Sequence, residues 1–237
     1  MILIRNLIYW LILVISLLIL FPFMLLCLPS SNAVRAIANM WVNTLMWSLE
    51  HIVGLKYRVQ GLENIPSEPA IICSKHQSGW ETLAIQSIFP PLVFVAKKEL
   101  FKIPLFGWGL KMAKTIGIER GHKNAAQELL EQGLARKQEG LWIAIFPEGT
   151  RVAPGSKARY KTGGSRMAKL FEMNIVPVAL NSGEFWGRNS FMKYPGTIDV
   201  IIGKPISHTA GDEQELMNLC ENWIESQQEL INGKGRR

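Results

Sequence analysis

The sequence has few of the residues that build metal centres or disulfide frameworks. Its 237 residues include three cysteines and four histidines, and none of them follows the spacing of a zinc site or a redox pair. We therefore interpret the cysteines as small apolar residues and expect no metal site. Internal repeats and low-complexity segments are also missing, which argues against a repeat protein.

A nucleic-acid partner is not expected, although the chain is basic. It has 26 Lys and Arg residues against 19 Asp and Glu, a net charge of +7. Zinc-finger spacing, a basic helix and the ribonucleoprotein aromatic motif are all missing. Basic surface attracts anionic lipid headgroups and anionic substrates, so membrane lipid is the expected partner.

Residues 7–29 contain no charged residue. As a helix they would be about 34 Å long, enough for the ~30 Å hydrocarbon core of a bilayer. A signal peptide would be shorter and closely followed by a small-residue cleavage site. Residues 31–54 follow with the pattern of an amphipathic helix. We expect residues 1–54 to be a membrane anchor and residues 55–237 a separate domain.

Two topologies of this anchor stay open. Pro22 is expected to kink or break the apolar helix. Arg5 precedes the apolar stretch and Arg35 follows it, so positive charge gives little help with orientation. We favour a re-entrant hairpin with both ends on one side, and a single membrane span is the alternative.

Residues 55–237 alternate between strand and helix patterns. Short apolar runs predict strands near 55–60, 69–74, 92–96, 141–146, 175–180 and 197–202. Helices are predicted at 124–138, 164–173 and 212–231. The last has Thr209 as a candidate cap and one broad apolar stripe of Leu216, Leu219, Trp223 and Leu230. Such alternation predicts an α/β fold with a largely parallel central sheet flanked by helices.

His76 and Glu81 are the first candidate site residues. They lie just after an apolar run, in the sequence Ser74-Lys75-His76-Gln77-Ser78-Gly79-Trp80-Glu81. An imidazole titrates near neutrality, and a carboxylate on one ring nitrogen leaves the other nitrogen free to accept a proton. A polar turn at a strand end would look the same if nothing else supported a site.

A second polar block follows the apolar run 141–146, with the sequence Phe146-Pro147-Glu148-Gly149-Thr150-Arg151. Pro147 cannot donate to a strand ladder, so the strand should end there. Gly149 lets a ligand approach the backbone, and the Arg151 guanidinium suits a phosphate. The alternative is a tight turn with a surface arginine.

The two blocks together resemble motifs of the glycerolipid acyltransferase family, most closely the bacterial 1-acylglycerol-3-phosphate (lysophosphatidate) acyltransferases. Residues 116–120 (Ile-Gly-Ile-Glu-Arg) and 175–178 (Ile-Val-Pro-Val) are similar to two further family motifs in the expected order. The resemblance covers roughly residues 55–205. The chain departs from the family at Glu81, where aspartate is usual, so the geometry around His76 can differ.

The resemblance implies a fold, an activity and a location. The fold would be a mixed sheet flanked by helices, as in glycerol-3-phosphate acyltransferase. The activity would be acyl transfer from acyl-CoA or acyl carrier protein to the sn-2 hydroxyl of lysophosphatidate. This reaction makes phosphatidic acid in phospholipid biosynthesis and needs no cofactor. The location would be the bacterial cytoplasmic membrane, with the catalytic domain on its cytosolic face.

The resemblance also implies roles for single residues. His76 would take the hydroxyl proton and Glu81 would stabilise the imidazolium. The substrate-binding residues would be Arg120, Glu148, Gly149, Thr150, Arg151 and Pro177. Among them Arg120, Gly149 and Arg151 would hold the acceptor phosphate, Glu148 would position the glycerol, and Pro177 would shape an apolar wall.

Three alternatives stay open. Ser78 could be a nucleophile, although no Gly-x-Ser-x-Gly elbow surrounds it. The acceptor could be another lysolipid, for example one with an amino-acid headgroup. The chain could also be a catalytically silent membrane-binding protein, but such a protein has no need for a base.

Overall fold

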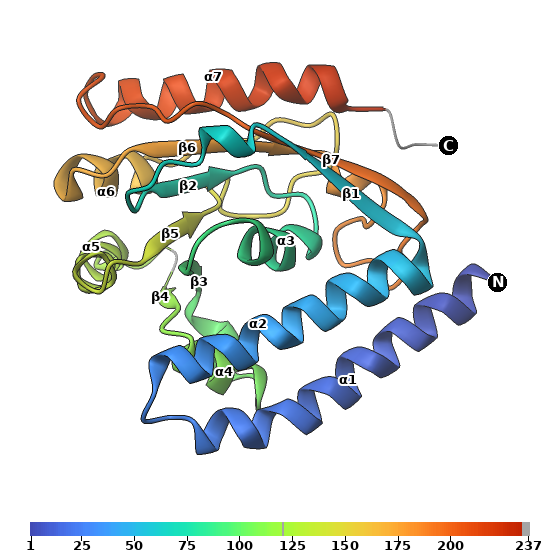
Figure 1. The fold of residues 1–237 in the computed structure, drawn as a ribbon. Coiled ribbons are helices and arrows are strands. Elements are labelled where there is room, and N and C mark those ends of the chain that lie inside the picture. The colour runs from blue at the N-terminus through green and yellow to red at the C-terminus, as the bar shows by residue number, and fades with distance from the viewer. Residues whose placement is uncertain (120, 234–237) are drawn as a thin grey trace.

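The computed structural model describes residues 1–119 and 121–233, which build one mixed β-sheet with helices on both faces (Figure 1). The sheet has seven strands in the order β1-β7-β6-β2-β5-β3-β4. The strands are β1 (Leu55–Gln60), β2 (Ile71–Ser74), β3 (Leu92–Lys97), β4 (Ile116–Ile118), β5 (Trp142–Ile145), β6 (Ile175–Leu180) and β7 (Gly196–Ile202).

Neighbouring strands are parallel except β6 and β7, which are antiparallel. The prediction of a largely parallel sheet is confirmed, and so is the mixed sheet that the resemblance implied. Strand β4 was not predicted as a strand, because three residues with a central glycine give no periodicity to detect. It lies at the sheet edge, where the Gln132 side chain bonds both backbone groups of Gly117 at 3.1 and 3.0 Å.

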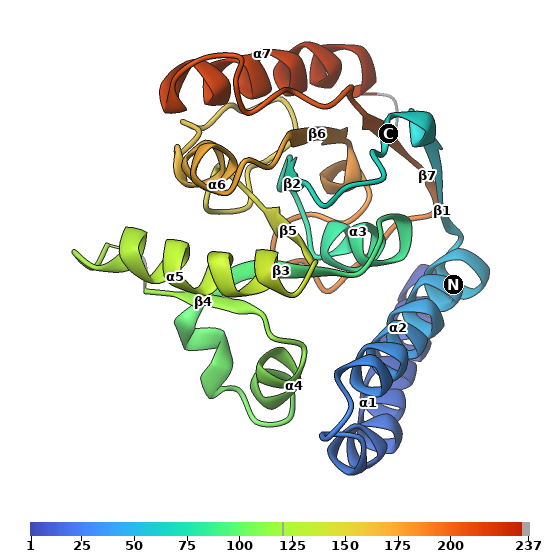
Figure 2. The same cartoon turned by 60° about the vertical axis from the view of Figure 1, so that its left-hand side comes forward.

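The helices divide between the two faces of the sheet (Figures 1 and 2). Strand alternation explains the division: Ile71 and Cys73 belong to one buried cluster and Ile72 to the other. The first cluster includes α5 (Ala125–Gln138), α6 (Gly163–Phe171) and α7 (Glu213–Ile231); the second includes α3 (Trp80–Ile88) and α2 (Ser31–Ser48). The remaining helices are α1 (Ile2–Leu26), α4 (Phe106–Met112) and the short η1 (Leu49–Val53), η2 (Leu62–Asn64), η3 (Lys98–Lys102) and η4 (Ser182–Glu184).

Helix α1 runs without a break past Pro22, so the expected break is wrong. Pro22 lies close to the carboxyl end of the helix, where few turns depend on the bond it removes. The neighbouring Phe21 is buried and its ring lies 5.9 Å from that of Trp108, which supports the last turns. Among the described residues, α1 is the one helix long and apolar enough to cross a membrane, which is weak evidence of membrane association.

Helix α7 differs from the prediction at its start and on its buried face. Asp212, not Thr209, caps it, in a capping box with Glu215. Leu219 and Leu230 are exposed, whereas the buried positions are Leu216, Met217, Cys220, Ile224, Glu225, Gln228 and Ile231. The buried face of the helix therefore does not coincide with the apolar stripe, and two polar residues, Glu225 and Gln228, face inward. Their partners are in the site described next.

Candidate active site

Three chain segments meet at the same edge of the sheet. Strands β5, β2 and β6 are adjacent and parallel, so the loops that follow them converge. These loops carry His76, Glu148 and Ser182. The first two were candidates from the sequence, and the third was not.

His76 and Glu81 are in direct contact. The Nδ1 atom of His76 lies 2.8 Å from Oε1 of Glu81, so the extra methylene of glutamate does reach the imidazole. The imidazole ring stacks on the ring of Phe146, with centroids 4.0 Å apart and planes 14° apart. A carboxylate at Nδ1 favours the tautomer with a proton there, which leaves Nε2 able to accept one. His76 is partly exposed while Glu81 is fully buried.

Five donors surround the Glu81 carboxylate. Its Oε1 accepts from the backbone N–H groups of Gln77 and Ser78 at 2.6 and 2.7 Å, besides His76. Its Oε2 accepts from the hydroxyls of Ser78 and Ser182, both at 2.8 Å. Burial alone would raise the pKa of the Glu81 carboxyl, but His76 and these bonds together hold that pKa below its ordinary value. The carboxylate is therefore kept ionised beside the imidazole.

The Ser78 hydroxyl has three partners in this cluster that fit a structural role, one of them the Ser182 hydroxyl at 3.1 Å. Its hydroxyl donates to Glu81, and it also accepts from the backbone N–H of Trp80 at 2.9 Å. The residue is fully buried, and among the described residues its hydroxyl makes no hydrogen bond to an imidazole that could act as its base. This arrangement gives no support to the alternative in which Ser78 is a nucleophile.

Glu148 points into the protein rather than toward solvent. One carboxylate oxygen, Oε2, accepts from the backbone N–H of His76 at 2.8 Å, and the other lies 2.8 Å from the Lys75 ammonium. Burial raises the pKa of the Glu148 carboxyl, and the cation of Lys75 and the N–H of His76 counter this in part. In this state both oxygens of Glu148 are engaged by the protein itself.

The loop after β5 carries the predicted phosphate ligands. Gly149 has a φ of +69°, a left-handed conformation that favours glycine. Thr150 and Arg151 follow it; Thr150 is exposed and Arg151 is partly exposed. The Arg151 guanidinium lies 3.4 Å from the Asn189 side-chain oxygen. Arg120 lies outside the described residues.

Two further cations lie around this loop and were not predicted. Lys161 packs against Gly149, with its Nζ 3.2 Å from where a Cβ would stand, and its backbone N–H donates to Pro147. Arg188 donates to the backbone oxygen of Arg151 at 3.3 Å. The loop is therefore bordered by basic side chains from three segments of the chain.

Pro177 lies apart from these residues. It is inside β6, three residues before the strand ends at Leu180, and pairs in register with Cys73. Its ring packs next to Gly203, as does the Trp223 indole. The structure therefore does not bring Pro177 to the edge of the sheet where His76 lies. Among residues 1–119 and 121–233, no three His, Cys, Asp or Glu side chains gather as metal ligands would.

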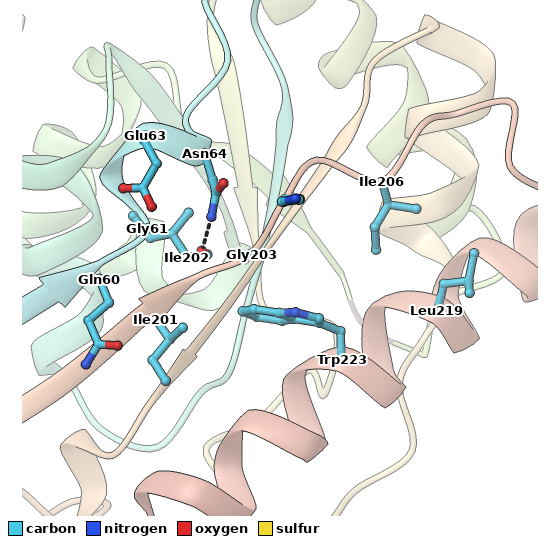
Figure 3. A pocket seen from close by; sticks show the side chains of 11 residues that line it. Gln60, Gly61, Glu63, Asn64, Ile201, Ile202, Gly203, Ile206, Leu219 and Trp223 are labelled. Carbon is cyan, nitrogen blue, oxygen red and sulfur yellow. Dashed lines mark hydrogen bonds between the residues drawn. The ribbon is translucent and has the colours of Figure 1, made fainter.

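An open pocket of about 630 Å³ lies at the opposite end of the sheet (Figure 3). Gln60 ends β1, Ile202 ends β7, and the Trp223 indole of α7 lies flat beside them. Because β7 is antiparallel to β6, these strand ends are at the amino end of β6, away from His76. The pocket contains none of the predicted site residues, so we assign the chemistry to the loops after β2, β5 and β6.

The sequence matches one protein family and several named proteins. A family model described as "Acyltransferase" matches residues 56–181, just over half of the chain. A 1-acyl-sn-glycerol-3-phosphate acyltransferase of Pseudomonas aeruginosa is 39% identical over 83% of this chain and 78% of that protein. A chloroplastic enzyme of the same name from Arabidopsis thaliana, LPAT1, is 28% identical over 81% of this chain and 54% of that protein. The chain thus spans only about half the length of this plant relative.

A solved structure shows the same fold. The crystal structure of the 1-acyl-sn-glycerophosphate acyltransferase PlsC from Thermotoga maritima superposes with a TM-score of 0.80, covering 100% of both chains at 22% identity. At that identity the likeness speaks for the fold alone. The family match and the Pseudomonas relative go further, because they show the family. The chain belongs to the acyltransferase family.

Proposed function

We propose that this protein transfers an acyl group from acyl-CoA or acyl carrier protein to the sn-2 hydroxyl of 1-acylglycerol-3-phosphate. The observation that carries the proposal is the 2.8 Å contact between His76 Nδ1 and a fully buried Glu81. The relatives named as 1-acyl-sn-glycerol-3-phosphate acyltransferases support lysophosphatidate as the acceptor.

In the proposed reaction His76 is the general base. Its Nε2 takes the proton of the acceptor hydroxyl while the hydroxyl oxygen attacks the thioester carbonyl. Glu81 stabilises the imidazolium that forms, because its carboxylate is held in place by four donors besides His76. The tetrahedral intermediate then expels the thiolate, which takes the proton back from the imidazolium. No covalent acyl-enzyme and no cofactor are needed.

The acceptor phosphate is proposed to bind along the loop after β5. Arg151 would supply a charge-assisted contact, with Gly149 and Thr150 leaving room for the phosphate to approach the backbone. Lys161 and Arg188, which border the same loop, support this assignment because a dianionic phosphate favours several cations. Arg120 keeps its proposed role of a further phosphate ligand. Glu148 would position the glycerol indirectly, because its carboxylate holds the backbone N–H of His76.

Residues 1–54 are proposed to anchor the catalytic domain, residues 55–237, on the cytosolic face of the bacterial membrane. Most large apolar side chains of α1 are exposed, as a lipid-facing helix requires. Helices α1 and α2 lie antiparallel (Figure 1), and α2 leads through η1 into β1. This pairing supports the re-entrant hairpin over the single span.

Contacts at the amino end of α1 support the same topology. The Asn6 side chain exchanges two hydrogen bonds with the backbone of Lys193, at 3.0 and 2.8 Å. The Lys193 ammonium lies 4.5, 4.0 and 4.3 Å from the ring centroids of Tyr9, Trp10 and Trp186. Both ends of the hairpin are therefore held at the catalytic domain. Burial lowers the pKa of Lys193 to about 7, and the aromatic faces offset part of its lost hydration.

Purified protein with lysophosphatidate and a panel of acyl donors, followed by lipid mass spectrometry, tests the activity. Phosphatidate is expected with wild type, and His76→Ala should lower turnover by roughly a hundredfold or more while acceptor KM changes little. Product with another lysolipid but none with lysophosphatidate would mean that the acceptor is that other lysolipid. Near-normal turnover of His76→Ala would refute the base mechanism, and no product from any acceptor would favour the silent membrane-binding protein.

Cysteine labelling tests the topology. Leu3 is exposed near the amino end of α1, so Leu3→Cys, in a chain with Cys27→Ser, is a site for an impermeant thiol reagent. The hairpin predicts labelling in permeabilised cells and in inverted vesicles, but not from outside intact cells. Labelling from outside intact cells would establish a single span.

A further inference from the structure

Lys75 is buried between two glutamates, one residue before His76. Its side chain is 1% exposed, and its ammonium lies 2.8 Å from Glu148 Oε1 and 2.7 Å from Glu225 Oε1. Glu225 also accepts from the Tyr160 hydroxyl at 3.0 Å. Lysine is almost never fully buried without such partners, because removing an ammonium from water costs several kcal/mol. This cluster therefore joins the ends of β2 and β5 to helix α7.

The cluster leads directly to the backbone of the proposed base. Glu148 uses one oxygen for Lys75 and the other for the N–H of His76, at 2.8 Å. On its other side, the carbonyl of His76 accepts from the N–H of Val152 at 2.7 Å. The peptide groups of His76 are thus fixed by the loop after β5, while its ring is fixed by Glu81. Because Lys75 holds the other oxygen of the Glu148 carboxylate at 2.8 Å, we expect the contact to the His76 N–H to weaken when Lys75 is replaced.

We propose that Lys75 and Glu225 are positioning residues for the acyl transfer, acting through Glu148 on the backbone of His76. This role rests on the proposed function of His76 as the base. It makes helix α7, which follows all four family-like motifs in the chain, part of the machinery that sets the imidazole. It also gives Glu148 a task besides substrate binding.

Two substitutions, Lys75→Met and Glu225→Gln, change the charge around Glu148 in opposite directions. Lys75→Met removes the cation and leaves two buried carboxylates facing each other, so Glu148 becomes easier to protonate. Glu225→Gln keeps an oxygen for Lys75 and Tyr160 but removes a negative charge, so Glu148 becomes harder to protonate. The charged and titratable groups around Glu148 are Lys75 and His76 after β2, Tyr160 and Lys161 before α6, and Glu225 with the neighbouring Glu221 and Cys220 on α7.

The kinetic test compares these variants at several pH values. Lys75→Met should lower kcat by roughly tenfold to a hundredfold, the effect of a displaced catalytic group, with acceptor KM within about twofold of wild type. The acidic limb of its pH–kcat profile should move to higher pH, and that of Glu225→Gln to lower pH. The controls are Lys157→Met and Glu229→Gln, because this pair also joins α7 to the loop before α6 but is exposed, at 3.5 Å. Both controls should behave as wild type.

A second readout does not depend on activity. The chain has four histidines, so selective ¹⁵N-histidine labelling of the full chain in micelles gives four amide signals, and His76→Ala identifies that of His76. Lys75→Met should move the His76 amide proton upfield, as its bond to Glu148 weakens, and the Lys157→Met control should leave it in place. If Lys75→Met does not fold, the opposite pH shift of Glu225→Gln carries the test.

Two results would overturn the inference. One is a His76 amide signal and a kcat that Lys75→Met leaves unchanged. The other is acidic limbs that move in the same direction in both variants, which indicates a loss of stability rather than a change at Glu148. If wild-type protein makes no phosphatidate, the proposed function fails by itself, and the amide signal still decides whether Lys75 sets the backbone of His76.

Discussion

Glu81→Gln separates what the buried carboxylate does for catalysis from what it does for stability. The substitution keeps the size and shape of the side chain and removes its charge. The amide oxygen can still accept from the N–H groups of Gln77 and Ser78, which lie 2.6 and 2.7 Å from Oε1. The amide nitrogen then faces the hydroxyls of Ser78 and Ser182, which must turn to accept from it.

The two effects on stability are of similar size and opposite sign. A hydrogen bond to a charged group contributes about 1.5–3 kcal/mol and a neutral one about 0.5–1.5, so four bonds become weaker by about 1 kcal/mol each. Against this, a buried carboxylate has a desolvation penalty of several kcal/mol, which glutamine avoids. The free energy of unfolding at neutral pH should therefore change by less than about 2 kcal/mol.

No such cancellation protects catalysis. The imidazolium of His76 exists only after proton transfer, so the charge of Glu81 acts mainly in the transition state. Glu81→Gln should lower kcat by roughly 10²–10⁴-fold, the range of general acid–base effects, with little change in acceptor KM. Initial rates of phosphatidate formation measure the first effect and the thermal midpoint measures the second. Glu139→Gln is the control, because Glu139 also pairs with cations, Lys114 and Arg136, but lies at the end of α5.

The combination of results decides the reasoning. A kcat within about threefold of wild type would refute the role of Glu81 in proton transfer. A large loss of kcat together with a large fall in the thermal midpoint would mean that the carboxylate mainly holds the loop together. Only a slow variant of near-normal stability fits the proposed electrostatic role.

Three further predictions follow from single contacts. Arg151→Ala should raise acceptor KM about tenfold or more, since a charge-assisted phosphate contact is worth roughly 1.5–3 kcal/mol, and an equal rise in donor KM would contradict this. Asn6→Ala should destabilise the protein by about 1–3 kcal/mol, because two buried backbone groups of Lys193 lose their partner, as denaturant titration would show. The pKa of Glu81 is lowered, so its charge stabilises the fold above the unfolded pKa of about 4.3. The unfolding free energy of wild type, relative to that of Glu81→Gln, should therefore decrease as pH falls through the lower folded pKa. A difference in unfolding free energy that stays constant with pH would refute this.

The sequence predicts the sheet well because buried parallel strands are short uniform apolar runs. The strand predicted near 175–180 coincides with β6, and that near 55–60 with β1. Prediction from the sequence fails where apolar residues are exposed and polar residues are buried. Leu219 and Leu230 are exposed on α7, although an apolar stripe predicts them to be inside. An apolar stripe predicts the buried face only when the polar residues of the helix face solvent. In α7, Glu225 and Gln228 are buried instead.

Some of the site residues could be predicted from the sequence and others could not. His76 and Glu81 can be found from the sequence because they lie five positions apart in one loop, so local geometry alone brings them together. Ser182 lies 101 positions from Glu81, yet its hydroxyl donates to that carboxylate. It can be anticipated only by a general rule, that polar residues just after buried parallel strands meet at one edge. Its neighbour in the chain, Gly183, donates to the Gln77 side chain in the same region.

The buried polar residues of α7 show what information is missing from a pattern. Gln228 accepts from the Gln77 side chain at 2.9 Å and donates to the carbonyl of Leu180 at 2.9 Å, while Glu225 reaches Lys75. Each contact joins α7 to a residue next to His76 or to the end of β6. A glutamate three positions before a glutamine on an amphipathic helix is ordinary when both are solvated. It becomes informative only once the turn of the helix is known, because the same two side chains then occupy buried positions that apolar residues would otherwise fill. A helix that gives up apolar burial at two positions needs compensating partners, and here both sets of partners are at the proposed active site.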